Sequence, residues 1–136
     1  MYKQIMVAVD GSEIAKQALA EAVNIANTYN AAICIVHCIG SENEADAGKG
    51  KEILEQAKSE TDVLSVETRL LKADVEYGLS GIADAIAAAV YDWKADLLVV
   101  GTSNRRGLER FYLGSVAEQL VAKVDSSILL VRSKQN

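Results

Sequence analysis

The sequence predicts an open α/β fold in which helices cover both faces of a parallel sheet. Five short apolar runs alternate with longer segments whose apolar residues recur at helical spacing, and the alternation continues along the whole chain. Four of the five runs are almost continuously apolar, as expected for parallel strands buried between two helical layers. Such a sheet has right-handed crossovers and takes its ligand beyond the carboxyl ends of the strands, where the strand order reverses.

The five predicted strands comprise residues 5–9, 32–39, 66–71, 96–100 and 127–131. The third differs from the others because Val66, Thr68 and Leu70 alternate with two charged residues, Glu67 and Arg69. One face of this strand is therefore expected to meet water, which favours a place at an edge of the sheet. No composition break divides the chain, and its 136 residues are expected to form a single domain, 1–136.

Four helices are expected between these strands. The first follows Ser12, which has the position of an N-cap, and the third covers the apolar positions of residues 82–90. The fourth is expected to begin at Ser115, which has capping-box spacing with Glu118. The polar, glycine-rich segment 40–50 is interpreted as a mobile loop, followed by a short second helix over residues 51–58.

The composition excludes several classes of function. One His and two Cys are too few for a closed zinc site, which needs ~4 ligands. A net charge of -5 disfavours binding to nucleic acid or an anionic membrane, because phosphates are held by an excess of Lys and Arg. Without a signal peptide or an apolar run of ~18 residues, the chain is expected to be cytoplasmic. Cys34 and Cys38 would stand ~13 Å apart on one strand, too far for a disulfide.

Polar segments follow the first and the fourth predicted strands, where a ligand is expected. Asp10 comes directly after the first strand, and the segment 101–107 follows the fourth and leads towards Gly114 and Ser115. Three of the five arginines of the chain lie close together there, at Arg105, Arg106 and Arg110. Positive charge and glycines beside a helix N-terminus predict a phosphate cradle, although the chain has neither a P-loop nor a dinucleotide-binding glycine motif.

These residues resemble the universal stress protein family along nearly the whole chain. Residues 5–12 match its opening strand and Val-Asp-Gly-Ser turn, His37 matches the end of its second strand, and residues 101–118 match its signature region. The ATP-binding branch of the family carries the pattern Gly-x2-Gly-x9-Gly-Ser/Thr. Here the pattern reads Gly101-x2-Asn104-x9-Gly114-Ser115. Asn104 tolerates the left-handed backbone region, and its side chain could either occupy the space of a phosphate or donate a hydrogen bond to it.

The resemblance implies a sheet in the order 3-2-1-4-5, similar to that of adenine nucleotide alpha hydrolases, and a site for ATP accompanied by Mg²⁺. Asp10 would accept from ribose hydroxyls or meet a metal-bound water, Cys38 would contact adenine through its backbone, and Ser115 would donate to phosphate. The binding residues that it implies are Ala8, Val9, Asp10, Cys38, Gly101, Thr102, Ser103, Asn104, Arg105, Arg106, Gly107, Gly114, Ser115 and Val116.

The resemblance also implies a homodimer, formed through the last strand, which begins at Ser127 and ends at Val131. An apolar strand at the edge of a sheet is usually paired or covered, which agrees with pairing between two copies. The alternative is that the short tail 132–136 guards this edge.

The expected function is a stress-response sensor or switch that binds ATP with little or no hydrolysis. No catalytic residue is assigned, His37 is interpreted as structural, and slow hydrolysis assisted by Asp10 stays open. Taken alone, Ser115 fits an N-cap as well as a phosphate ligand, and Asp10 fits a turn residue. Two other hypotheses remain. One is a family member that binds no nucleotide and acts through its dimer surface and a protein partner, which Asn104 favours; the other is a nucleotide-using hydrolase or transferase.

Overall fold

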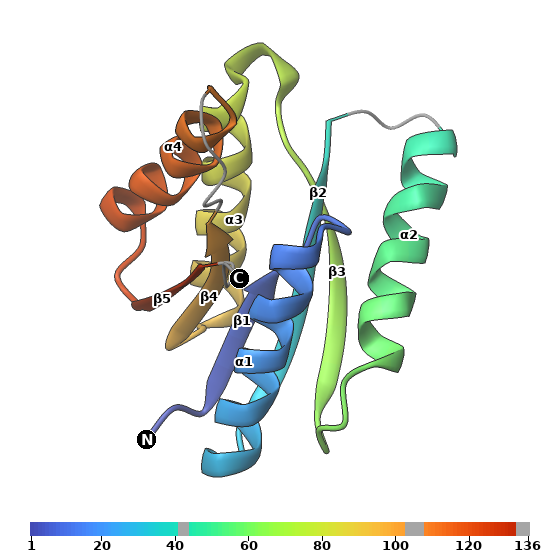
Figure 1. The fold of residues 1–136 in the computed structure, drawn as a ribbon, viewed down its shortest axis with the longest axis vertical. Coiled ribbons are helices and arrows are strands. Elements are labelled where there is room, and N and C mark those ends of the chain that lie inside the picture. Colours follow the sequence, from blue (N-terminus) through green and yellow to red (C-terminus); the bar gives the residue numbers. More distant parts are fainter. Residues whose placement is uncertain (41–43, 103–107, 133–136) are drawn as a thin grey trace.

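The computed structural model describes residues 1–40, 44–102 and 108–132, and the side chains that it describes in α4 begin at Val116. It contains a five-stranded parallel sheet in the predicted order β3-β2-β1-β4-β5 (Figure 1). The elements in chain order are β1 (Gln4–Ala8), α1 (Glu13–Tyr29), β2 (Ala32–Ile39), α2 (Glu44–Ser59), β3 (Val66–Lys72), the 3-10 helix η1 (Val75–Tyr77), α3 (Leu79–Trp93), β4 (Leu97–Thr102), α4 (Leu108–Lys123) and β5 (Ser127–Arg132).

Two apolar cores lie on opposite faces of the sheet. Because side chains alternate along a strand, Ile5 and Val7 of β1 pack with α1 and α2, whereas Met6 between them packs with α3 and α4. β2 repeats this division, with Ile33 and Ile35 in the first core. The central strands are therefore apolar on both sides, which is why their sequences read as continuous apolar runs.

Polar side chains fix the two ends of the first βα unit. Asp96, just before β4, accepts from the backbone N–H of Lys3 at 2.9 Å and of Gln4 at 3.1 Å, which ties the start of β1 to β4. At the other end Ser12 is the N-cap of α1, as predicted, and accepts from the N–H of Ala15 at 3.3 Å. The Asp96 contacts therefore fix the start of β1, and the Ser12 contact fixes the turn from β1 into α1.

The prediction of a loop over residues 40–50 is wrong for its second part, because α2 already begins at Glu44. Gly50 lies inside the helix and has a packing role. A Cβ on Gly50 would stand 2.7 Å from Leu70 Cδ1 and 3.2 Å from His37 Cδ2, so the missing side chain lets α2 approach β2 and β3 closely. A glycine that suggested a loop is therefore a contact point between a helix and the sheet.

The prediction that the fourth helix begins at Ser115 is also wrong. α4 begins at Leu108, so Ser115 lies in its interior and is not an N-cap. The preceding residues include Leu108, Glu109 and Arg110, which are good helix formers and favour an earlier start. Inside a helix the backbone N–H donates to the carbonyl four residues earlier, so it is not the open donor that a helix N-terminus offers.

Both predicted edges of the sheet are confirmed. β3 and β5 each pair with one neighbour, and Leu130 of β5 is 40% exposed. Cys34 and Cys38 are free thiols, in agreement with the expectation that they form no disulfide. Within the described ranges, none of the helices combines the length and apolar character needed to span a bilayer.

Candidate functional site

A cavity of about 210 Å³ lies at the carboxyl ends of β1 and β4. The strand order reverses between these two strands, so the cavity occupies the place where open α/β sheets bind ligands. Its walls come from the turn between β1 and α1, the ends of β2 and β4, and the facing sides of α3 and α4. The lining residues are Ala8, Val9, Asp10, Ser12, Ile14, Ala15, Val36, His37, Cys38, Ile82, Ile86, Val100, Gly101, Val116, Ala117 and Leu120.

The cavity brings together some of the residues predicted for the site. Those that line it are Ala8, Val9, Asp10, Cys38, Gly101 and Val116. Thr102 is the last residue of β4 and is not among the lining residues, while Gly114 and Ser115 lie within α4. The predicted residues Ser103, Asn104, Arg105, Arg106 and Gly107 lie outside the described part of the chain.

Sequence reasoning missed most of the apolar wall. Ile82 and Ile86 of α3 were recognised only as core positions, and Ala117 and Leu120 of α4 received no role in binding. Their helical spacing was the available signal, because positions four apart on α3 point to the same side. That spacing does not distinguish a side chain packed on the sheet from one that borders a cavity.

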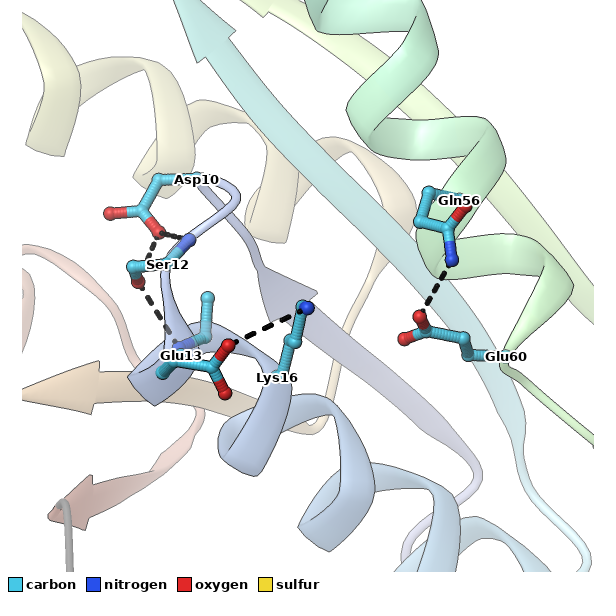
Figure 2. Close-up of polar contacts among 7 residues, drawn as sticks. Asp10, Ser12, Glu13, Lys16, Gln56 and Glu60 are labelled. Atoms are coloured by element: carbon cyan, nitrogen blue, oxygen red, sulfur yellow. Dashed lines mark hydrogen bonds and ion pairs between the residues drawn. The ribbon is translucent and has the colours of Figure 1, made fainter.

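Asp10 joins the end of β1 to the start of α1. Its Oδ1 accepts from the backbone N–H of Ser12 at 2.9 Å and from the Ser12 hydroxyl, as Figure 2 shows. Gly11 between them has φ +85°, a conformation that favours glycine. The carboxylate thus has the turn role that the sequence left open, while its second oxygen points away from Ser12 (Figure 2).

Close packing against Ile14 explains why residue 101 is a glycine. A Cβ at this position would stand 2.8 Å from Ile14 Cγ1 and 3.1 Å from the Ile14 carbonyl oxygen. Gly101 is also paired with Val131 of β5, so it belongs to the sheet rather than to the loop after it. The glycine permits the first turn of α1 to lie against β4, which closes one wall of the cavity.

His37 connects β2 to the end of β1. Its Nδ1 donates to the Val9 carbonyl, with 2.7 Å between the two atoms. The backbone N–H of Val9 donates to the carbonyl of Val36 at 2.9 Å. This contact agrees with the structural role expected for His37, and the residue also lines the cavity.

The two thiols are held in their neutral form by burial. Desolvation raises the pKa of Cys38, in the cavity wall, to about 11. Desolvation also raises the pKa of Cys34 to about 12, with a further increase from the negative charge of Glu67 and an opposing effect of Arg69. Neither thiol has the low pKa of a reactive cysteine, so Cys38 contributes a small apolar surface to the cavity wall.

The strand order, with an apolar core on each face of the sheet, places this chain in the class of doubly wound α/β proteins. Comparison with known proteins defines it further. The sequence profile of the universal stress protein family matches residues 1–132, and the chain belongs to that family.

Relatives and solved structures agree with this assignment. The chain is similar to a universal stress protein of Methanocaldococcus jannaschii, with 29% identity over 97% of this chain and 83% of that protein. A relative in Staphylococcus haemolyticus is 32% identical over 98% of this chain and 87% of its own length. A universal stress protein of Archaeoglobus fulgidus, solved in complex with dAMP, is 26% identical, with a TM-score of 0.74 and coverage of 96% and 98%.

A further solved structure, a universal stress protein in complex with cAMP, supports the fold. It has a TM-score of 0.79 at 23% identity, and the match covers 98% of this chain and 99% of that one.

Proposed function

We propose that this protein binds an adenine nucleotide, ATP with Mg²⁺, in the cavity at the carboxyl ends of β1 and β4. The observation that carries the proposal is the cavity itself, which lies at the switch point of the sheet and is bordered by Asp10. The solved structure of a related protein in complex with dAMP supports the choice of an adenine nucleotide.

The residues of the cavity fit the parts of a nucleotide unequally. Its wall is mostly apolar, which suits a purine ring, and its volume of about 210 Å³ is smaller than the ~300–1,000 Å³ of most ligand pockets. The cavity therefore fits the base and part of the ribose, with the second Asp10 oxygen available to ribose hydroxyls. The phosphates would extend past the end of β4, where Gly101 and Val116 line the cavity.

Mg²⁺ fits a site between the nucleotide phosphates and Asp10. Mg²⁺ usually takes one or two carboxylates and fills its other positions with phosphate oxygens and water. Asp10 is the carboxylate that lines the cavity in the described part of the chain. The ion would neutralise phosphate charge, and Asp10 would orient a water bound to it.

The proposed role is that of a stress-response sensor or switch with little or no hydrolysis. Fast phosphoryl transfer needs a group that positions the attacking water, and Asp10 is the candidate among the described lining residues. One of its oxygens is already held by Ser12. We propose further that the protein is a cytoplasmic single-domain homodimer joined through β5, whose Leu130 is 40% exposed.

A second candidate is a family member that binds no nucleotide and acts through its dimer surface on a protein partner. Two observations favour it. Asn104 replaces one glycine of the ATP-binding pattern, and α4 begins at Leu108, so its N-terminus is not at Ser115.

Mass spectrometry of small molecules released from the freshly purified protein, followed by calorimetric titration with ATP-Mg, separates the two candidates. The leading proposal expects adenine nucleotide in the released fraction and saturable binding. No released nucleotide and no heat of binding at millimolar ATP-Mg would support the second candidate instead. Phosphate release well above background, abolished by Asp10→Ala, would indicate an enzyme.

A further inference from the structure

His37 lies where β1, β2 and α2 meet at the border of the cavity. It is the only histidine of the chain. One side of its ring faces the Val9 carbonyl, and Gly50 of α2 covers the other side, where an added Cβ would stand 3.2 Å from Cδ2. Because residue 50 has no side chain, α2 closes over the ring and holds it in one orientation.

The ring takes the place of a backbone hydrogen bond. The N–H of Val9 donates to the Val36 carbonyl, one step beyond the last β1–β2 pair, Ala8 with Val36. In a parallel ladder the next bond would run from the N–H of Cys38 to the Val9 carbonyl. Within the part of the chain that the structure describes, that bond is not formed, and His37 Nδ1 donates to the carbonyl instead.

The bond to Val9 also orients the residue that follows it. The peptide between Val9 and Asp10 is trans, so the Val9 carbonyl and the Asp10 N–H point in opposite directions. The carbonyl is held on the β2 side by His37, and the Asp10 N–H is therefore directed to the β4 side. The cavity lies there, between the ends of β1 and β4.

We propose that His37 is a positioning residue of the nucleotide site. By holding the Val9 carbonyl, its ring aims the Asp10 N–H at the ligand and leaves the N–H of Cys38 without its ladder partner. The inference rests on the proposed function, since the ligand is an adenine nucleotide. A carbonyl oxygen accepts only, so the neutral ring carries its proton on Nδ1.

Three substitutions of His37 distinguish a positioning role of its ring from a packing role. His37→Asn places an amide N–H near the position of Nδ1, whereas His37→Gln carries its amide further out, near the position of Nε2. His37→Leu fills the space without a donor. We expect His37→Asn to bind ATP-Mg within about twofold of the unmodified protein, and the other two to bind roughly tenfold more weakly, the effect of one lost hydrogen bond. A packing role predicts the reverse order, because Asn is the smallest of the three.

Titration of the unmodified protein with ATP-Mg, run beside the variants, distinguishes failure of the proposed function from failure of the positioning role. Absence of binding to the unmodified protein overturns the proposed function, whereas unchanged affinity in His37→Leu overturns the positioning role alone. Nitrogen NMR of the ligand-free protein labelled at its single histidine tests the bond directly and needs no variant to fold. A proton on Nδ1 of the neutral ring is expected, and a proton on Nε2 would overturn the inference.

Discussion

The contact between Gly101 and Ile14 makes a quantitative prediction about the wall of the cavity. In Gly101→Ala the new Cβ would meet Ile14 Cγ1 at 2.8 Å, about 0.7 Å closer than the ~3.5 Å at which carbon atoms normally come into contact. The Ile14 carbonyl oxygen stands 3.1 Å from the same Cβ, so a rotation of the Ile14 side chain alone does not relieve the contact. The first turn of α1 must therefore move, and overpacking of this kind lowers the free energy of unfolding by about 1–3 kcal/mol.

Urea unfolding followed by circular dichroism measures this change. Gly48→Ala is the matched control, because Gly48 is exposed in α2 and an added Cβ has no neighbour within 4 Å. The control is expected to raise the free energy of unfolding by about 0.5–1 kcal/mol, as Ala favours a helix over Gly.

A double-mutant cycle identifies the cause. Ile14→Ala removes Cγ1, so Gly101→Ala combined with it should cost less than the sum of the two single changes, by about 0.5–3 kcal/mol. Additive free energies would refute the contact as the source of the loss, and a stabilised Gly101→Ala protein would refute the close approach of α1 to β4.

Three further predictions follow from the contacts described. Asp96→Ala removes the acceptor for the N–H groups of Lys3 and Gln4 and should lower the free energy of unfolding by about 1–2 kcal/mol in urea. Burial raises the pKa of the two thiols, so the stability that they contribute is complete below pH 9.0, the ordinary pKa, and is lost as the pH rises towards about 11 and 12. A protein with both cysteines replaced by Ala should therefore lose less free energy of unfolding between pH 8 and 10 than the unmodified protein, measured in urea. Leu130→Arg places charge on the exposed edge of β5 and should convert the proposed homodimer into monomers in analytical ultracentrifugation, whereas an unchanged mass would place the interface elsewhere.

The sequence predicted the sheet well because its strands carry strong local signals. The apolar runs of β1, β2 and β4 and the alternation in β3 depend on burial of each strand's own faces, which the residues reveal directly. Ser12 was likewise predicted as an N-cap from a short-range pattern. The carboxyl ends of the strands followed from the topology, so the general location of the cavity and the lining role of Asp10 could be predicted.

The loop predicted over residues 40–50 was wrong at a glycine whose role depends on partners distant in the sequence. Gly50 suggested a loop, but its role is set by Leu70 and His37, on two other elements. The packing reason for Gly101 is of the same kind, because the first turn of α1 fills the space beside it. A single sequence shows that a glycine is present, but the atoms that require it come from tertiary packing.

The most direct test of nucleotide binding in the cavity is a pair of ATP-Mg titrations. Ala8 lines the cavity, so Ala8→Leu should fill part of its volume and abolish binding without lowering the unfolding temperature. Ala20→Leu makes the same substitution on the exposed side of α1 and should bind as the unmodified protein does. Binding lost only in Ala8→Leu is the predicted result, and equal affinity in both variants would contradict the cavity as the nucleotide site.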